Sequence, residues 1–107
     1  MTFREYQIGA RRTQNPDLTP RERVEHALWG LSAEVGEVCG LWQKTHQGHS
    51  MDFAALRKEI GDCLWMLGEL CDACDFDMGA VAEENIAKLK RRYPDGFAAE
   101  RSVDRRE

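Results

Sequence analysis

The fold is decided by residues 19–45, which read TPRERVEHALWGLSAEVGEVCGLWQKT. The segment opens with Thr19-Pro20-Arg21-Glu22, a capping box with proline at the first helical position, and this combination marks the start of a helix. Beyond it, apolar residues recur at the three- and four-residue spacing of an amphipathic helix: Leu28, Leu31, Val35, Val38 and Trp42. We therefore predict one long helix that runs to about Thr45.

A second long helix follows after a short break. The segment His46-Gln47-Gly48-His49-Ser50 interrupts the apolar pattern and is predicted to be a loop. Residues 52–74 then carry a second apolar stripe, made by Leu56, Ile60, Leu64, Leu67 and Cys71. Because the loop is short, we expect the two long helices to lie antiparallel.

Two shorter helices flank this pair. The first spans about residues 2–14 and stops before the turn cluster Asn15-Pro16-Asp17. The last runs from a cap at Asp77 to about Arg91, because the proline of Tyr93-Pro94 disfavours helix at the residue before it. The predicted fold class is all-α, a four-helix bundle in residues 1–97, followed by a charged tail in residues 98–107 that we expect to be flexible.

Composition limits the possible functions. A chain of 107 residues with 42% apolar and 32% charged residues is typical of one globular domain. The net charge of −4 argues against binding to duplex DNA or to an anionic membrane, since either would need a basic face. No 18-residue apolar run and no signal-peptide core is found, so we expect a cytoplasmic protein.

The cysteines do not indicate a zinc site. Cys71 and Cys74 form one C-x-x-C, and His46 and His49 one H-x-x-H, but their order and spacing match no common zinc module. We interpret the cysteines as reduced, small apolar residues within helices.

Two tryptophans raise the question of a second subunit. Trp29 and Trp65 lie away from the apolar stripes of their helices, on the far sides. Large rings in those positions suggest helices that are covered on both sides, as in a homodimer. The alternative is that each ring lies beneath the first helix or the tail.

Two acidic pairs are the candidate functional residues: Glu34-x-x-Glu37 on the first long helix and Glu59-x-x-Asp62 on the second. Residues three apart share a helix face, so each pair presents two carboxylates side by side. An acidic pair is usually a solvated edge, but no lysine or arginine occurs between Arg23 and Lys44. Antiparallel helices would bring the pairs together, and four oxygen ligands select Mg²⁺, with Mn²⁺ as a substitute. Such an ion suggests hydrolysis of a phosphate ester or anhydride.

These patterns resemble the MazG-like all-α nucleoside triphosphate pyrophosphohydrolases. The similarity includes residues 31–38 (LSAEVGEV), residues 57–65 (RKEIGDCLW) and residues 85–97 (NIAKLKRRYPDGF). Tyr6-Gln7 and the segment Ala10-Arg11-Arg12-Thr13 resemble the opening helix of small, single-domain members. The resemblance covers about residues 3–97.

The resemblance implies a helical bundle, a homodimer or dimer of dimers, that hydrolyses (deoxy)nucleoside triphosphates to monophosphate and pyrophosphate in nucleotide-pool housekeeping. By position, the catalytic residues and metal ligands would be Glu34, Glu37, Glu59 and Asp62. One of them, or a glutamate held free of the metal, would help to deprotonate the water that attacks the α-phosphorus. Substrate-binding positions of the family correspond to Asn85, Lys88, Arg92, Lys44 and Trp42.

Some of these assignments have local alternatives. Lys88 can pair with Glu84, Arg92 can be a solvated helix end, and Trp42 also lies on the apolar stripe. Some relatives carry an additional glutamate where this chain has Ala33, which leaves the base and the number of metal ions open. His49, in the loop, is a further candidate for substrate contact.

Two other functions fit the same patterns. One is a non-catalytic helical dimer that binds nucleotide or metal, and the other is a structural dimer whose acids form a solvated edge. A di-iron carboxylate bundle fits less well, because neither pair has the histidine of an E-x-x-H motif. The base preference of an enzyme cannot be read from the sequence.

Overall fold

The computed structural model describes residues 1–105, and their regular structure is entirely helical. Its elements are α1 (Phe3–Ala10), a 3₁₀ turn η1 (Arg11–Thr13), α2 (Pro20–Thr45), α3 (Phe53–Ala73), α4 (Met78–Arg92) and α5 (Ala99–Val103). The predicted all-α class and the two long helices are confirmed. The segment expected to be a tail contains the short helix α5, and its last two residues lie outside the described range.

Local capping explains where the helices begin. Thr19 and Glu22 form the predicted capping box at the start of α2, with their side chains bonded reciprocally to backbone N–H groups. The Asp52 and Asp77 side chains accept backbone N–H groups at the starts of α3 and α4. Gly48 takes a φ of +92° after the end of α2, a conformation that a side chain would strain. These signals fix α2 and α3 as separate helices joined by a tight connection.

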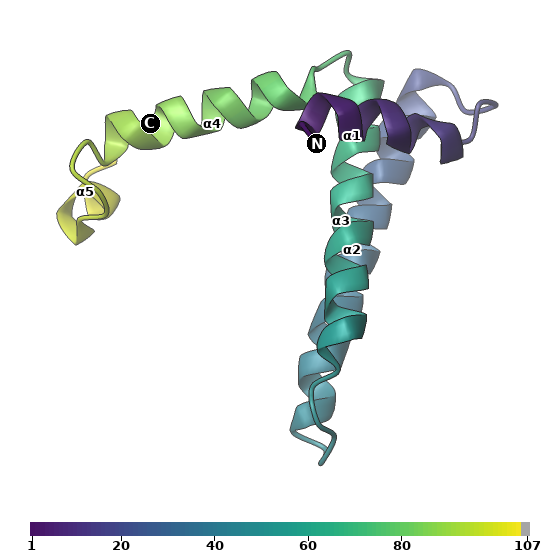
Figure 1. The fold of residues 1–107 in the computed structure, drawn as a ribbon, viewed down its shortest axis with the longest axis horizontal. Coiled ribbons are helices and arrows are strands. Elements are labelled where there is room, and N and C mark those ends of the chain that lie inside the picture. The colour runs from purple at the N-terminus through teal and green to yellow at the C-terminus, as the bar shows by residue number, and fades with distance from the viewer. Residues whose placement is uncertain (106–107) are drawn as a thin grey trace.

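The helices α2 and α3 lie side by side as an antiparallel pair, the α2–α3 hairpin (Figure 1). The two helices approach closely at Gly30, where a Cβ atom would lie 2.5 Å from the Met66 sulfur. A side chain at position 30 would therefore require the Met66 side chain to move. Figure 1 shows α1 crossing one end of the hairpin, which leaves the rest of its length uncovered by that helix.

A buried carboxylate connects α1 and η1 to α3. The Asp72 side chain is 7% exposed and accepts hydrogen bonds from Gln7, Arg11 and Gln14. Burial by itself would raise the Asp72 pKa, but the hydrogen bonds from these three residues outweigh it and leave the pKa below its usual value. Gln7 also bonds the backbone on either side of the α3–α4 turn, at Phe76 and Met78. This network positions both flanking helices on the end of the hairpin.

The helix α4 leaves the hairpin instead of packing along it. It begins beside the end of α3, packs against α1 and runs away from the α2–α3 hairpin (Figure 1). The radius of gyration is 17.0 Å, against about 13 Å for a compact chain of this length. The accessible surface is 8134 Å², whereas about 6,100 Å² is usual for a monomer of 12.3 kDa. The single chain is open.

Half of the ten predicted stripe residues are consequently exposed. Among the described residues, the fully buried apolar side chains are Ala10, Ala27 and Met78. The outward-facing stripe residues, together with Phe53, are 40–64% exposed: Leu28, Val35, Trp42, Phe53, Ile60 and Leu67. We call these six residues the apolar face. No helix within the described part of the chain is long and apolar enough to cross a membrane.

The two tryptophans behave differently from each other. Trp65 is partly buried, and its indole N–H donates to the Thr13 hydroxyl in η1 at 3.0 Å. The alternative in which the first helical segment covers the ring therefore holds for Trp65. Trp29 is 70% exposed, so within residues 1–105 it lacks a comparable cover.

Replacing Asp72 by alanine should lower the free energy of unfolding by about 2–3 kcal/mol, because three donors lose a buried, charged acceptor. Urea unfolding at pH 7, followed by circular dichroism, measures this loss. Since the Asp72 pKa is lowered, its stabilisation is present above the unfolded value of about 3.8 and is lost as the pH falls through the lower folded value.

Asp17→Ala is the matched control for this prediction. The Asp17 side chain is exposed and makes no hydrogen bond or ion pair within the described residues. A loss in Asp72→Ala no larger than in this control would contradict the assignment of Asp72 as the connection between α1, η1 and α3.

Candidate metal centre

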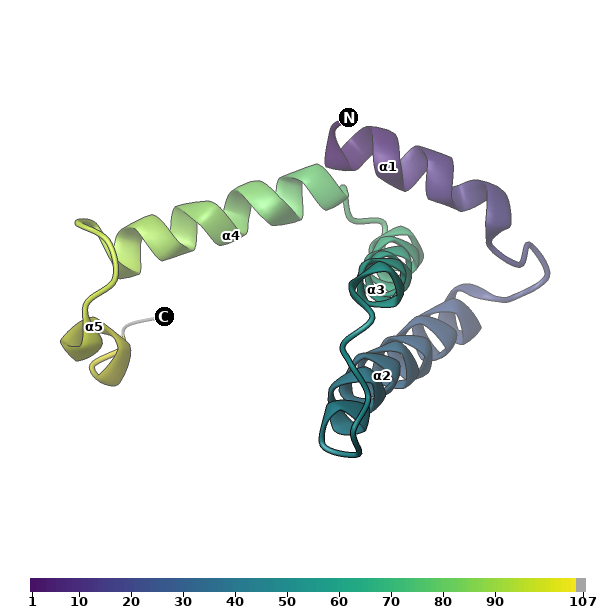
Figure 2. The ribbon, with the colours of Figure 1, turned by 60° about the horizontal axis from the view of Figure 1, so that its bottom comes forward.

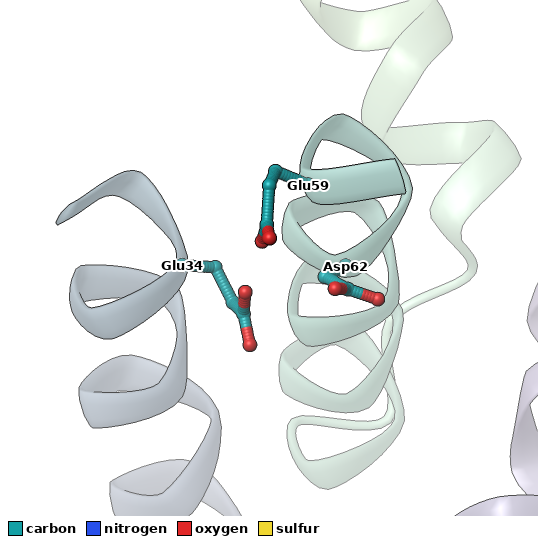
Figure 3. A group of neighbouring side chains, drawn as sticks. All are labelled: Glu34, Glu59 and Asp62. Atoms are coloured by element: carbon teal, nitrogen blue, oxygen red, sulfur yellow. The ribbon is translucent and has the colours of Figure 1, made fainter. Parts of the chain in front are cut away.

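Three of the four predicted acids meet in the hairpin. Glu34 from α2 and the α3 residues Glu59 and Asp62 each bring a carboxylate oxygen within 4.8 Å of the others. Figure 3 shows the Glu34 and Glu59 side chains directed toward each other across the space between the helices, with Asp62 below Glu59 on the α3 side. We call these three residues the acidic cluster.

Helical spacing and register explain the arrangement. Glu59 and Asp62 are three apart and share a face of α3. Gly30 of α2 lies against the Met66 side chain of α3, and one turn further along α2 the antiparallel pairing brings Glu34 level with Asp62. The cluster thus depends on how closely α2 and α3 pack.

The cluster creates a strongly negative local field. The neighbouring Glu59 carboxyl, through a hydrogen bond, raises the pKa of Glu34, and burial and the charge of Asp62 raise it further. Burial raises the pKa of the Cys63 thiol, and the charges of the same three carboxylates add to that effect. A bound cation would remove this repulsion, because each carboxylate would then face positive charge.

An unpaired oxygen supports a cation in this place. The Glu59 Oε2 atom is buried and has no hydrogen-bond partner within the described residues. A buried carboxylate oxygen normally finds a donor or a metal. Three carboxylates without histidine or cysteine ligands match the preference of Mg²⁺ or Mn²⁺, so the residues present fit the predicted ion.

The fourth predicted acid stands beside the cluster. Glu37 is exposed, one turn along α2 from Glu34, and is outside the group of three. Its charge still acts on Glu34, where it makes the smallest of the contributions that raise the pKa. The structure therefore distinguishes Glu37 from the other three acids, which the spacing alone did not.

The predicted substrate-binding residues are not gathered around the cluster in this chain. Asn85, Lys88 and Arg92 lie on α4, in the part of that helix that runs away from the hairpin (Figure 1). Trp42 and Lys44 lie in the last turns of α2, where Trp42 is 50% exposed and Lys44 is exposed. His49 is exposed in the loop, with its backbone N–H bonded to the Lys44 carbonyl. Lys88 makes no ion pair with Glu84 within the described residues.

Sequence reasoning missed a polar pair further along the same hairpin. His26 of α2 and Glu69 of α3 are joined by a contact of 2.5 Å between Nδ1 and Oε1. The two residues are 43 positions apart, so no short motif contains both. The available signal was their helical spacing from the motif acids, because Glu69 is seven residues beyond Asp62 and lies nearly above it.

Comparison with known protein families identifies the chain. No curated protein and no solved structure gives a match. Residues 23–97 match the MazG nucleotide pyrophosphohydrolase domain, a region that includes both acidic pairs and α4 and takes in most of the chain. The chain therefore belongs to the MazG nucleotide pyrophosphohydrolase domain family.

Proposed function

We propose that this protein is a Mg²⁺-dependent pyrophosphohydrolase of (deoxy)nucleoside triphosphates, which releases the monophosphate and pyrophosphate in the cytoplasm. The observation that carries the proposal is the acidic cluster, with its buried and unpaired Glu59 oxygen, in a member of the MazG family. Nucleotide-pool housekeeping is the role that fits this reaction.

The side chains have separate tasks in this proposal. Glu34, Glu59 and Asp62 hold Mg²⁺, with Mn²⁺ as a substitute, and the bound ion supplies positive charge for the substrate phosphates. Glu37 is close to the cluster but outside it, so it remains available to accept a proton from the attacking water. The water attacks the α-phosphorus, the bond from that phosphorus to the bridging oxygen breaks, and pyrophosphate leaves.

A homodimer is part of the same proposal. Leu28, Val35 and Trp42 are each seven residues apart, and so are Phe53, Ile60 and Leu67 on the antiparallel helix. This heptad spacing places them along one side of the hairpin, about 100° around each helix from Glu34 and Glu59. The surface in excess of a compact monomer is about 2,000 Å² per chain, so two chains together have about 4,000 Å², which is in the range that obligate homodimers bury. A second copy presents an identical apolar face, and two dimers can pair further.

A second copy also accounts for the position of α4. Within one chain this helix carries Asn85, Lys88 and Arg92 away from the acidic cluster (Figures 1 and 2). Its apolar side chains Val81, Ile86 and Leu89 are 36–52% exposed, so α4 has an uncovered apolar side of its own. We propose that α4 of one protomer packs on its partner and brings these polar residues to the phosphates held at the partner's acidic cluster. Trp42 and Lys44, at the far end of α2, are the candidates for contacts nearer the connecting loop.

Removal of a cluster acid should abolish turnover without unfolding the chain. Glu59→Gln and Asp62→Asn are each expected to lower pyrophosphate release from the best (d)NTP by about 10²-fold or more, because the ion loses an anionic ligand. A phosphate-coupled pyrophosphate assay over a panel of (d)NTPs measures this, and it also reveals the base preference. Unchanged turnover in both variants, or nucleotide binding without pyrophosphate release by the wild type, would contradict the proposed reaction.

Metal binding can be tested without substrate. Mg²⁺ at about 100 times its dissociation constant should stabilise the wild type by about 2.7 kcal/mol, because only the folded chain assembles the cluster. Thermal melts with and without Mg²⁺ measure this stabilisation. Asp62→Asn should lose most of it, whereas Glu83→Gln, a change at an exposed acid on α4, should retain it. Equal shifts in the two variants would indicate a solvated acidic edge, as in a structural dimer.

Charge on the apolar face should prevent association. Light scattering after gel filtration is expected to give at least twice 12.3 kDa for the wild type and 12.3 kDa for Val35→Lys/Ile60→Lys. Gln47→Lys, at an exposed polar position in the loop, should leave the wild-type mass unchanged. A monomeric wild type would exclude the proposed interface.

A further inference from the structure

His26 and Glu69 form a polar contact between α2 and α3 outside the acidic cluster. The Glu69 side chain is 1% exposed, and its Oε1 lies 2.5 Å from Nδ1 of His26. Its second oxygen, Oε2, is buried without a hydrogen-bond partner within the described residues. The His26 side chain is 50% exposed. One buried carboxylate therefore holds a histidine ring whose other side reaches solvent.

The pair lies on the same side of the hairpin as the acids. Glu69 follows Asp62 by seven residues, and His26 precedes Glu37 by eleven. Seven residues and eleven residues are each close to a whole number of helical turns. Glu69 therefore lies within about 20° of Asp62 around α3, and His26 lies within about 20° of Glu37 around α2. Along the helix axes the pair is about 11–12 Å from Asp62 and Glu34. The acidic cluster and the histidine are thus two ends of one surface strip.

An aromatic ring occupies the space between these ends. Trp65 is three residues after Asp62 and four before Glu69, so these residues form a continuous ridge on α3. Its ring centroid is 6.4 Å from that of His26, and the two rings are nearly perpendicular, at 85°. The hydrogen bond from the indole N–H to Thr13 fixes the orientation of the ring. The strip therefore runs from carboxylates, past an indole, to an imidazole.

The buried carboxylate determines which nitrogen of His26 is available. In the neutral tautomer in which Nδ1 donates its proton to the Glu69 carboxylate, Nε2 is left as an acceptor. Nε2 is on the opposite side of the imidazole from Nδ1, and the ring is half exposed. The exposed end of the ring can therefore accept a hydrogen bond from an N–H group of a ligand.

We propose that His26, oriented by Glu69, reads the edge of the substrate's base and selects bases that present an amino group. This inference rests on the proposed function, because the phosphates of the substrate must lie at the acidic cluster. A nucleoside, with its sugar and base in line, then extends along the strip past Trp65 toward Nε2. The N4 amino group of cytosine or the N6 amino group of adenine donates to Nε2, whereas the carbonyl in the same position of uracil or hypoxanthine cannot.

The test compares nucleotides that differ only in this group. For the wild type, kcat/KM for dCTP should exceed that for dUTP, and dATP should be preferred over dITP, since a site built to accept a hydrogen bond disfavours the analogue without the donor. In His26→Ala the ratio for each pair should fall by about tenfold, mostly through KM of the amino substrate. Equilibrium binding of the α,β-imido analogues of dCTP and dUTP gives the same comparison without turnover.

Three further variants separate recognition from a structural role. His46→Ala removes an exposed histidine at the end of α2 and should leave both ratios unchanged. Glu69→Gln keeps an oxygen that accepts from Nδ1 and should preserve most of the selectivity. His26→Ala can fail to fold because Glu69 loses its partner. In that case the double variant His26→Leu/Glu69→Leu, which restores an apolar contact between the helices, is used to measure both ratios.

The outcomes distinguish this inference from the proposed function. Absence of pyrophosphate release by the wild type contradicts the proposed function, while the binding ratio still decides the role of His26. Ratios near one in the wild type, or ratios unchanged in the folded His26 variants, would show that the pair only ties α2 to α3.

Discussion

The close antiparallel packing of α2 and α3 is the constraint on which the rest of the structure depends. At Gly30 the absence of a side chain leaves room for the Met66 side chain of α3. The register of the pair brings Glu34 within reach of Glu59 and Asp62. The same register places His26 against Glu69 and aligns the two halves of the apolar face. A helix pair held further apart would lose the cluster and the histidine contact together.

Two features of the hairpin are unfavourable in an isolated chain. On one side it concentrates carboxylates, where the hydrogen bond to Glu59, burial and the neighbouring charges together raise the pKa of Glu34. On another side it exposes a row of large apolar residues that water solvates poorly. A bound cation would relieve the repulsion between the carboxylates, and a second copy of the chain would cover the apolar residues. The open shape of the chain is thus consistent with a protomer whose site and core are both completed by other molecules.

The helices themselves could be predicted from the sequence because their signals are local. The capping box at Thr19, the loop around Gly48 and the cap at Asp77 each act within a few residues of the backbone they shape. The acidic cluster could also be predicted, since three-residue spacing on two antiparallel helices brings the acids close. Glu37 was grouped with the other acids because spacing alone does not separate a carboxylate between the helices from one beside them.

What the sequence did not predict depends on contacts between distant segments. His26 and Glu69 carry no motif, and their contact exists only because the hairpin register aligns them. The amphipathic stripes do not reveal what covers them, because a heptad of apolar residues looks the same whether its partner is another helix of the chain or another chain. The direction in which α4 leaves α3 follows from the Gln7 and Asp72 network, whose members are 58 to 71 residues apart.

The central claim, that one acidic cluster works with α4 of a second copy, is tested most directly by mixing two inactive variants. Asp62→Asn lacks the ion-binding site and Lys88→Ala lacks the α4 cation, and the two are unfolded together and refolded as mixed dimers. If the site is shared, the mixed dimer contains one intact site, formed by the cluster of the Lys88→Ala chain and α4 of the Asp62→Asn chain. Pyrophosphate release should then return to about a quarter of the wild-type rate, since about half of randomly paired dimers are mixed and each has one of two sites. Mixed dimers that form but stay as inactive as either parent would contradict the account.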